Sequence, residues 1–214
     1  MERNPRTWKV KTHLSDDTIR LSQDDRQFLR DLARVQYISE DIAREQHYQD
    51  RKTAPKLRLD KLVEAGLLKR HTMHEYGKGK LAVYEFANDA LAKSWGGKRS
   101  VFGSNRTLQH EVITSRLYFS LNRPADFRKE NQFTAKDKQF ISRRSNGDHD
   151  YKPDALFTVS PGEVCFVEAD SGQYSKAQII KKQVAWQDVR QVWGQPRNAA
   201  ARIHSGGPVR VFHY

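Results

Sequence analysis

The 214-residue sequence lacks the features that mark secreted and membrane proteins. Its one cysteine, Cys165, lies inside an apolar run, so we expect a small buried hydrophobe rather than half of an internal disulfide, as suits a reducing cytosol. No stretch approaches the ~20 apolar residues of a membrane span, and the N-terminal MERNPRTWKVK has no apolar segment of a signal peptide. We therefore expect a cytoplasmic protein with no membrane partner.

Acidic side chains are also in the minority. The chain has 38 Lys and Arg against 26 Asp and Glu, which gives a formal net charge of +12. Residues 1–97 carry 19 basic and 15 acidic side chains and residues 98–214 carry 19 and 11, so the excess is not a basic tail. This balance favours a polyanion, first of all nucleic acid, as the partner.

The first half has the sequence pattern of three helices followed by a hairpin. Ser22 is a capping residue for a helix with apolar positions at helical spacing, and a second short helix is expected over 39–46. The third starts near Pro55, and two strand-like pieces follow around the Gly at position 79. This order is that of a winged helix-turn-helix, and the phrase KLVEAGLLKR is reminiscent of that family.

A winged helix binds DNA by placing the N-terminal end of its recognition helix in the major groove. Cations there serve phosphates or guanine edges, and the sequence leaves open which. A winged helix used for protein contacts is the alternative, but the cations are concentrated on the two elements that would touch DNA. The predicted DNA-binding residues of this half are Arg51, Lys52, Thr53, Lys56, Arg58 and, in the wing, Lys78 and Lys80.

A segment rich in Gly, Ser and cations separates the two halves. We predict a DNA-binding domain with an N-terminal extension over 1–97, a linker over 98–105 and a second domain over 106–214. The second domain is predicted to be α/β, with a central mixed sheet flanked by helices. Its predicted elements are a helix over 107–121, a strand near 133–141, a loop over 142–150, a hairpin over 151–170, a helix over 175–193 and a strand in the final PVRVFHY. The candidate core positions of the helix over 175–193 are Ile179, Ile180, Val184, Trp186, Val189 and Trp193.

Three carboxylates lie at the strand ends of the predicted hairpin, YKPDALFTVSPGEVCFVEAD. If the turn centres on Pro161, paired residue numbers sum to 322, so Asp154 lies opposite Glu168 with Cβ atoms ~4.5–5.5 Å apart. Asp170 is then on the same face as Glu168. Like charges placed opposite each other destabilise a sheet, and a divalent cation with oxygen ligands would offset this. A one-residue slip would move Glu168 to the other face, and three solvated acids are the plainer alternative.

The segments PDA and EAD resemble the restriction-endonuclease-like, or PD-(D/E)xK, nuclease superfamily. The resemblance implies that Asp154 and Glu168 hold a divalent metal, Mg²⁺ or Mn²⁺, which activates water for phosphodiester cleavage. It also implies a lysine two residues after Glu168, where this sequence has Asp170. Either Lys181 or Lys182 on the next helix then supplies the cation, or Asp170 joins the metal ligands.

In some branches of the superfamily an acid on the first helix is a further metal ligand, so the resemblance implies Glu111 as a candidate for that role. A solvated helix acid is the alternative for Glu111. The basic residues Arg143, Arg144 and Lys152 are expected to hold the DNA backbone near the site. Tyr174 is a candidate for a DNA contact or a covalent role.

The combination of a winged helix, PDA, VEAD and a Lys-rich helix resembles the MobC-type plasmid mobilization proteins, also called replication-relaxation proteins. The resemblance runs from about residue 22 to the end of the sequence. It implies a relaxase that binds a plasmid transfer origin and nicks one strand, with relaxosome accessory and coupling proteins as further partners. The alternatives are a non-catalytic DNA-binding accessory or transcription regulator, and a double-strand endonuclease of restriction or transposon type.

Overall fold

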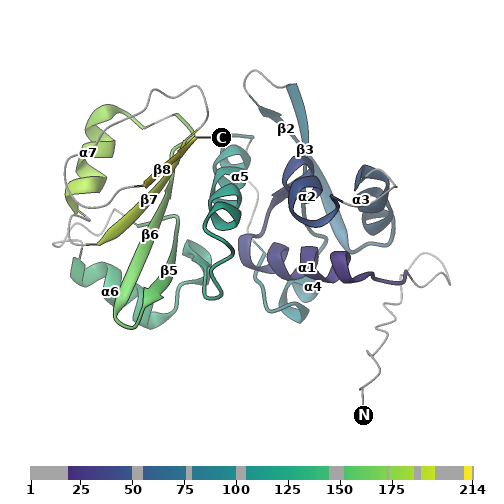
Figure 1. Cartoon of the computed structure of the whole chain (residues 1–214), viewed down its shortest axis with the longest axis horizontal. Coiled ribbons are helices and arrows are strands. Elements are labelled where there is room, and N and C mark those ends of the chain that lie inside the picture. The colour runs from purple at the N-terminus through teal and green to yellow at the C-terminus, as the bar shows by residue number, and fades with distance from the viewer. Residues whose placement is uncertain are drawn as a thin grey trace, which may run out of the picture. The chain divides into compact units, whose positions relative to one another are not determined.

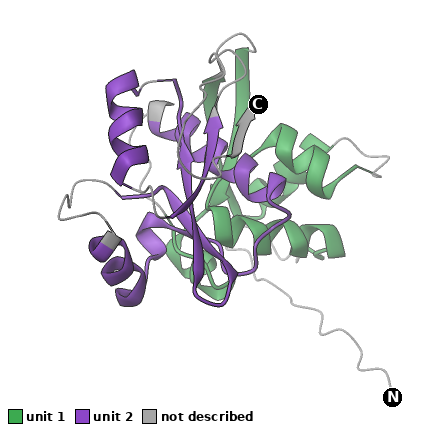
Figure 2. Cartoon of the chain, turned by 60° about the vertical axis from the view of Figure 1, so that its left-hand side comes forward, with its two compact units in different colours: residues 1–99 green, residues 100–214 purple. Residues whose placement is uncertain are grey.

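The computed structural model describes residues 19–49, 55–75, 79–99, 105–144, 152–172, 174–185, 189–195 and 210–213. The chain divides into two compact units, residues 1–99 and 100–214 (Figure 2), and the division falls within the segment predicted as the linker. Each unit combines helices with a sheet, so the mixed α/β class is confirmed (Figure 1). Among the described helices, none has the length and apolar character that a membrane span needs.

The first helix of unit 1, α1, spans Gln23–Val35 and begins as the sequence predicts. The backbone N–H of Asp25 donates to Ser22 Oγ at 3.2 Å, and the backbone N–H of Ser22 donates back to Asp25 Oδ2 at 2.6 Å. This reciprocal capping box satisfies donors that the first helical turn leaves unpaired. Its apolar face, including Phe28 and Leu32, is fully buried.

Unit 1 has two further helices and a three-stranded sheet whose first strand lies between the first two helices. Helix α2 spans Glu40–His47 and α3 spans Pro55–Glu64. The sheet is antiparallel throughout, in the order β1-β3-β2, with β1 over Ile38–Ser39, β2 over Leu68–Glu75 and β3 over Gly79–Phe86. A further helix, α4, spans Asp89–Ser94 and was not predicted.

Unit 2 has a five-stranded mixed sheet in the order β4-β5-β6-β7-β8. The first three strands pair antiparallel and the last three parallel. Helix α5 lies on one face of the sheet, and α6 and α7 lie on the other (Figure 1). The strands span Arg128–Lys129 (β4), Ala155–Ser160 (β5), Glu163–Ala169 (β6), Arg190–Gln195 (β7) and Arg210–His213 (β8), and the helices Asn105–Ser120 (α5), Ala135–Arg144 (α6) and Lys176–Ala185 (α7), with a 3₁₀ turn over Glu130–Gln132.

The predicted register of the β5–β6 hairpin is confirmed over most of its length. Ala155 pairs with Val167 and Thr158 with Val164, so the paired numbers sum to 322. The register shifts between Thr158 and the turn, where Ser160 pairs with Glu163. The one-residue slip, which would place Glu168 on the other face, therefore does not occur.

Two predicted elements of unit 2 were wrong. The strand near 133–141 is helix α6, because Thr134 and Asp137 form a capping box that starts a helix there. The helix over 175–193 ends at Ala185, and β7 begins at Arg190. Apolar residues of a helix and of a following buried strand form one continuous pattern, so periodicity missed the boundary.

The candidate core positions of this segment are confirmed only in part. Ile180 and Val184 were predicted as core positions but are 47% and 59% exposed. Ile179 on α7 and Trp193 in β7 are confirmed as core positions, because both are buried.

Candidate functional site

Asp154 is fixed against β6 at the start of the hairpin. Its backbone N–H donates to the carbonyl of Val167 at 3.0 Å, and its Oδ2 accepts from the backbone N–H of Ala169 at 2.7 Å. These bonds continue the confirmed register by one residue, towards the position opposite Glu168. The backbone of β6 therefore holds the Asp154 carboxylate beside the strand that carries Glu168.

Lys182 of α7 reaches Glu168 from the neighbouring layer. Its Nζ lies 2.5 Å from Glu168 Oε2 and 3.3 Å from the hydroxyl of Tyr174. The ammonium also lies 4.7 Å from the centroid of the Tyr174 ring. Lys181 is exposed, because adjacent helical residues point about 100° apart. Of the two lysines that the sequence left open, Lys182 is the one that meets the acid.

Glu168 is fully buried, and its two carboxylate oxygens differ in their surroundings. Lys182 contacts Oε2, whereas Oε1 has no hydrogen-bond partner among the described residues. Burial and the nearby Asp154 raise the pKa of Glu168, while Lys182 opposes the shift. A buried carboxylate oxygen without a partner is costly, so it marks a place where a cation or a proton would bind.

The pKa of Asp154 moves in the opposite direction. Burial alone would raise it, but His110, Lys182 and the backbone N–H of Ala169 outweigh burial and lower the pKa. Nε2 of His110 on α5 lies 3.0 Å from Asp154 Oδ2. Two carboxylates with pKa values pushed apart are typical of functional sites, although structural ion pairs produce the same pattern.

Glu111 of α5 contacts a lysine that lies near Asp154 and His110. Its carboxylate contacts the ammonium of Lys129 on β4, and the Lys129 side chain is only 6% exposed. The solvated alternative for Glu111 is therefore wrong, since its side chain is 14% exposed and ion-paired. Neither His110 nor Lys129 was predicted as a site residue, because nothing in the sequence indicates which strand α5 packs against.

Asp170, the third acid of the predicted site, is directed towards the following turn. Its Oδ1 accepts from the backbone N–H of Gly172 at 2.8 Å, and its own N–H donates to the carbonyl of Gly194 at 2.8 Å. Within the described ranges, no group of three or more His, Cys, Asp or Glu side chains is arranged to hold a metal ion. The described side chains thus leave Asp154 and Glu168 as the pair of candidate ligands.

A pair of carboxylates fits one kind of metal site. Mg²⁺ is usually held by one or two carboxylates together with substrate phosphates and waters, rather than by an all-protein cage. The unpartnered Oε1 of Glu168 is an oxygen ligand of the kind this ion prefers. The residues therefore fit a shared metal–substrate site and do not fit a closed metal cage.

The predicted DNA-binding residues of unit 1 have different surroundings. Arg51, Lys52, Thr53 and Lys78 lie outside the described residues. Lys56 is exposed on α3, where its Nζ lies 2.6 Å from Asp60, and Lys80 is exposed at the start of β3.

Arg58 serves the fold of unit 1. Its Nε and Nη2 donate to the two carboxylate oxygens of Asp25 at 2.9 and 2.5 Å, and Nη2 also donates to the carbonyl of Arg20 at 3.0 Å. Asp25 is fully buried and also caps α1. Because the guanidinium ties α3 to α1, we leave Arg58 out of the DNA-binding proposal.

The predicted DNA-binding cations of unit 2 lie on α6 and before β5. Arg143 is exposed near the end of α6, and the side chain of Arg144 lies outside the described residues. Lys152 Nζ lies 3.3 Å from Glu130 Oε1, with both side chains more than half exposed, and such surface pairs contribute little stability.

Comparisons with models of protein families, with curated proteins and with solved structures found no match. The family resemblance therefore depends on the PDA and EAD segments and on the order of the elements.

Proposed function

We propose that this chain is a metal-dependent DNA endonuclease that nicks one strand, with a winged-helix unit for binding and a restriction-endonuclease-like unit for cleavage. The observation that carries the proposal is Glu168, a fully buried carboxylate with one oxygen on Lys182 and the other unpartnered among the described residues. Asp154, fixed beside it by the backbone of Ala169, supplies the second carboxylate.

The side chains divide the work of such a site. Asp154 and Glu168 would hold Mg²⁺ or Mn²⁺, which when bound lowers the pKa of water and stabilises charge on phosphate. Glu168 in turn raises the pKa of Lys182 despite burial, so the ammonium stays charged. A fixed positive charge in a buried site stabilises negative charge that develops on phosphate. The Tyr174 hydroxyl, 3.3 Å from Nζ, helps to hold the ammonium in place.

Unit 1 would supply DNA binding. The chain order α1, β1, α2, α3, β2, β3, with the three strands in one antiparallel sheet, supports a winged helix. Lys56 and Lys80 are exposed on the elements that would face DNA. The resemblance to plasmid mobilization proteins suggests the transfer origin of a plasmid as the target, in the cytoplasm, with relaxosome and coupling proteins as partners.

The test is relaxation of a supercoiled plasmid that carries a transfer origin. We expect relaxation with Mg²⁺ or Mn²⁺, none with EDTA, and loss of relaxation in Glu168→Gln. The control is Glu130→Gln, an exposed acid of the same unit. Denaturing gels of the products distinguish a nick in one strand from cleavage of both, the outcome expected for a restriction- or transposon-type enzyme.

A second candidate is a non-catalytic DNA-binding accessory or regulator. It is favoured by Asp170, which stands where the superfamily has a lysine and bonds to the backbone of Gly172. A wild-type protein that binds the plasmid but never relaxes it, with either metal, would support this candidate and overturn the nuclease.

A further inference from the structure

Helix α6 of unit 2 exposes a basic face. The described side chains that it exposes to solvent contain three cations and no acid. Residues three, four or seven apart share a face of a helix, so these positions form one continuous exposed arc, with Lys136 and Arg143 along one edge and Lys138 along the other. They are Ala135, Lys136, Lys138, Gln139, Ser142 and Arg143.

The apolar side chains of α6 are used inside the unit. Ile141 packs in a buried cluster with Leu156 and Phe166, and the ring of Phe140 lies edge-on to Phe166 with centroids 6.1 Å apart. A helix that lies in a membrane surface needs an exposed apolar face. Helix α6 has no such face among its described residues, so a lipid surface does not fit.

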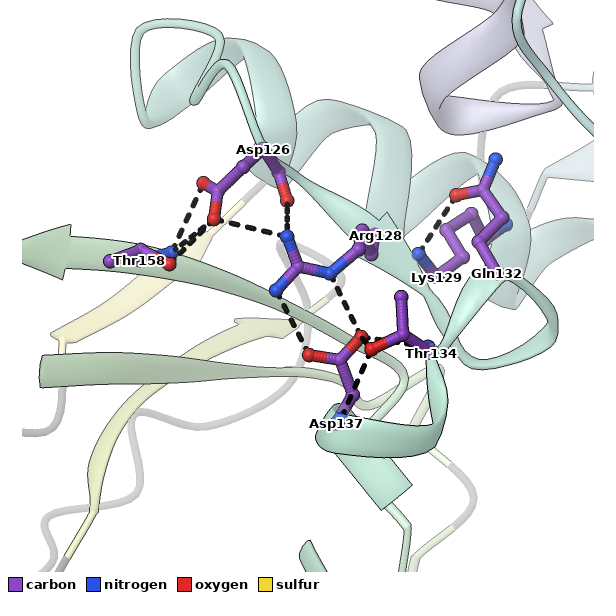
Figure 3. A network of polar contacts seen from close by, with 7 residues as sticks. All are labelled: Asp126, Arg128, Lys129, Gln132, Thr134, Asp137 and Thr158. Carbon is purple, nitrogen blue, oxygen red and sulfur yellow. Dashed lines mark hydrogen bonds and ion pairs between the residues drawn. The ribbon is translucent and has the colours of Figure 1, made fainter. Parts of the chain in front are cut away.

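The one acid of α6, Asp137, is hydrogen-bonded to an arginine of β4 and to the backbone before the helix. It accepts from the backbone N–H of Thr134 at 2.8 Å and from the Arg128 guanidinium at 3.0 and 3.1 Å (Figure 3). Arg128 in turn bonds to Asp126, which accepts from Thr158 of β5 (Figure 3). This network anchors the start of α6 to the sheet and leaves the charge of Asp137 unavailable to the exposed lysines.

We propose that the exposed face of α6 is a second docking surface for the phosphate backbone of DNA, separate from the DNA contacts proposed for unit 1. Among the described residues, Lys136, Lys138 and Arg143 have no ion-pair partner, so docking would break no existing pair. Lysine, arginine, serine and glutamine side chains are common donors to phosphate oxygens. The inference rests on the proposed DNA-binding function and adds where unit 2 holds its substrate.

The test measures the salt dependence of binding by the full chain to a fluorescently labelled duplex DNA. The slope of log K against log salt is negative, and its magnitude is the quantity compared here. Each lost phosphate contact lowers this magnitude by about 0.9. We expect Lys136→Gln/Lys138→Gln to lower the slope by about 1.8, and added Arg143→Gln to lower it further. The control, Lys176→Gln/Arg190→Gln, also removes two exposed cations from unit 2, of which Arg190 is paired with Glu163, and should leave the slope unchanged.

The possible results distinguish failure of the α6 docking surface from failure of the proposed function. If the wild type binds and the α6 variant keeps the wild-type slope, the docking surface is refuted while the proposed function stands. An equal fall in the α6 and control variants also refutes it, because net charge alone would then explain binding. If the wild type shows no salt-dependent binding to duplex DNA, the proposed function itself fails.

Discussion

The ammonium of Lys182 lies 2.5 Å from Glu168 Oε2, although 14 residues and a change of layer separate them. Lys182 belongs to α7 and Glu168 to β6, and both side chains are buried. In the resemblance drawn from the sequence, the lysine is expected two residues after the acid on the same strand. The structure gives Glu168 a lysine from the following helix.

Removing this lysine should destabilise unit 2. In Lys182→Met, Glu168 loses the partner of its charge, and breaking a buried pair from one side costs about 3–5 kcal/mol. The raised pKa of Glu168 lets the carboxyl take a proton, so we expect the lower end of that range, about 3 kcal/mol. Hydrogen exchange of the β6 amides, recorded at increasing denaturant, measures the loss in the free energy of unfolding. The exposed neighbour Lys181→Met should stay within about 0.5 kcal/mol, and an equal loss in both variants would contradict the pairing.

Metal affinity should distinguish the three acids. Asp154→Asn and Glu168→Gln each remove a candidate ligand charge. The affinity for Mn²⁺, measured by electron paramagnetic resonance, should therefore fall at least about tenfold. Asp170→Asn should bind Mn²⁺ nearly as well as the wild type, because an amide oxygen can still accept from the Gly172 N–H. A loss of binding in Asp170→Asn as large as in Glu168→Gln would restore the three-acid site.

Unit 1 should lose stability in acid through Asp25. Burial alone would raise the pKa of Asp25, but hydrogen bonds from Arg58 and Ser22 outweigh it and lower the pKa below its usual value. The charged carboxylate therefore stabilises the fold at neutral pH, and this contribution is lost as the pH falls through the folded pKa.

The matching measurement compares the wild type with Asp25→Asn across pH. At pH 7 we expect the variant to be less stable by about 1.5–3 kcal/mol, the range for a hydrogen bond to a charged group. The difference should shrink as the pH falls below the ordinary Asp pKa, because the wild-type carboxyl then takes up a proton in the unfolded state before it does so in the folded state. A difference that is constant with pH would show that charge on Asp25 plays no part.

A substitution of Lys80 tests whether the proposed wing contacts DNA. If it contacts a phosphate, Lys80→Ala should lower the salt slope of duplex binding by about 0.9. Lys93, exposed on α4, offers a matched control outside the proposed wing, and Lys93→Ala should keep the wild-type slope. An unchanged slope in Lys80→Ala would remove this residue from the DNA-binding surface.

Local signals explain which parts of the fold could be predicted. The Ser22 cap and the Pro-Gly turn of the hairpin are short-range features, and both recur in the structure. The prediction failed at 133–141, where a capping box beginning at Thr134 was missed, and at β7, where the apolar pattern of α7 continues into a strand. In both places short apolar runs were ambiguous between helix and strand.

By itself, the sequence determined the pairing of β5 with β6 and so the approach of Asp154 to Glu168, because strand alternation and a short turn set a register locally. Only the tertiary structure decided the rest of the site. The packing of α7 and α5 against the sheet selected Lys182 over Lys181, brought His110 to Asp154 and paired Glu111 with Lys129. Those contacts each join a helix to the sheet, and side-chain direction across a packed layer depends on how the helix is rotated against it.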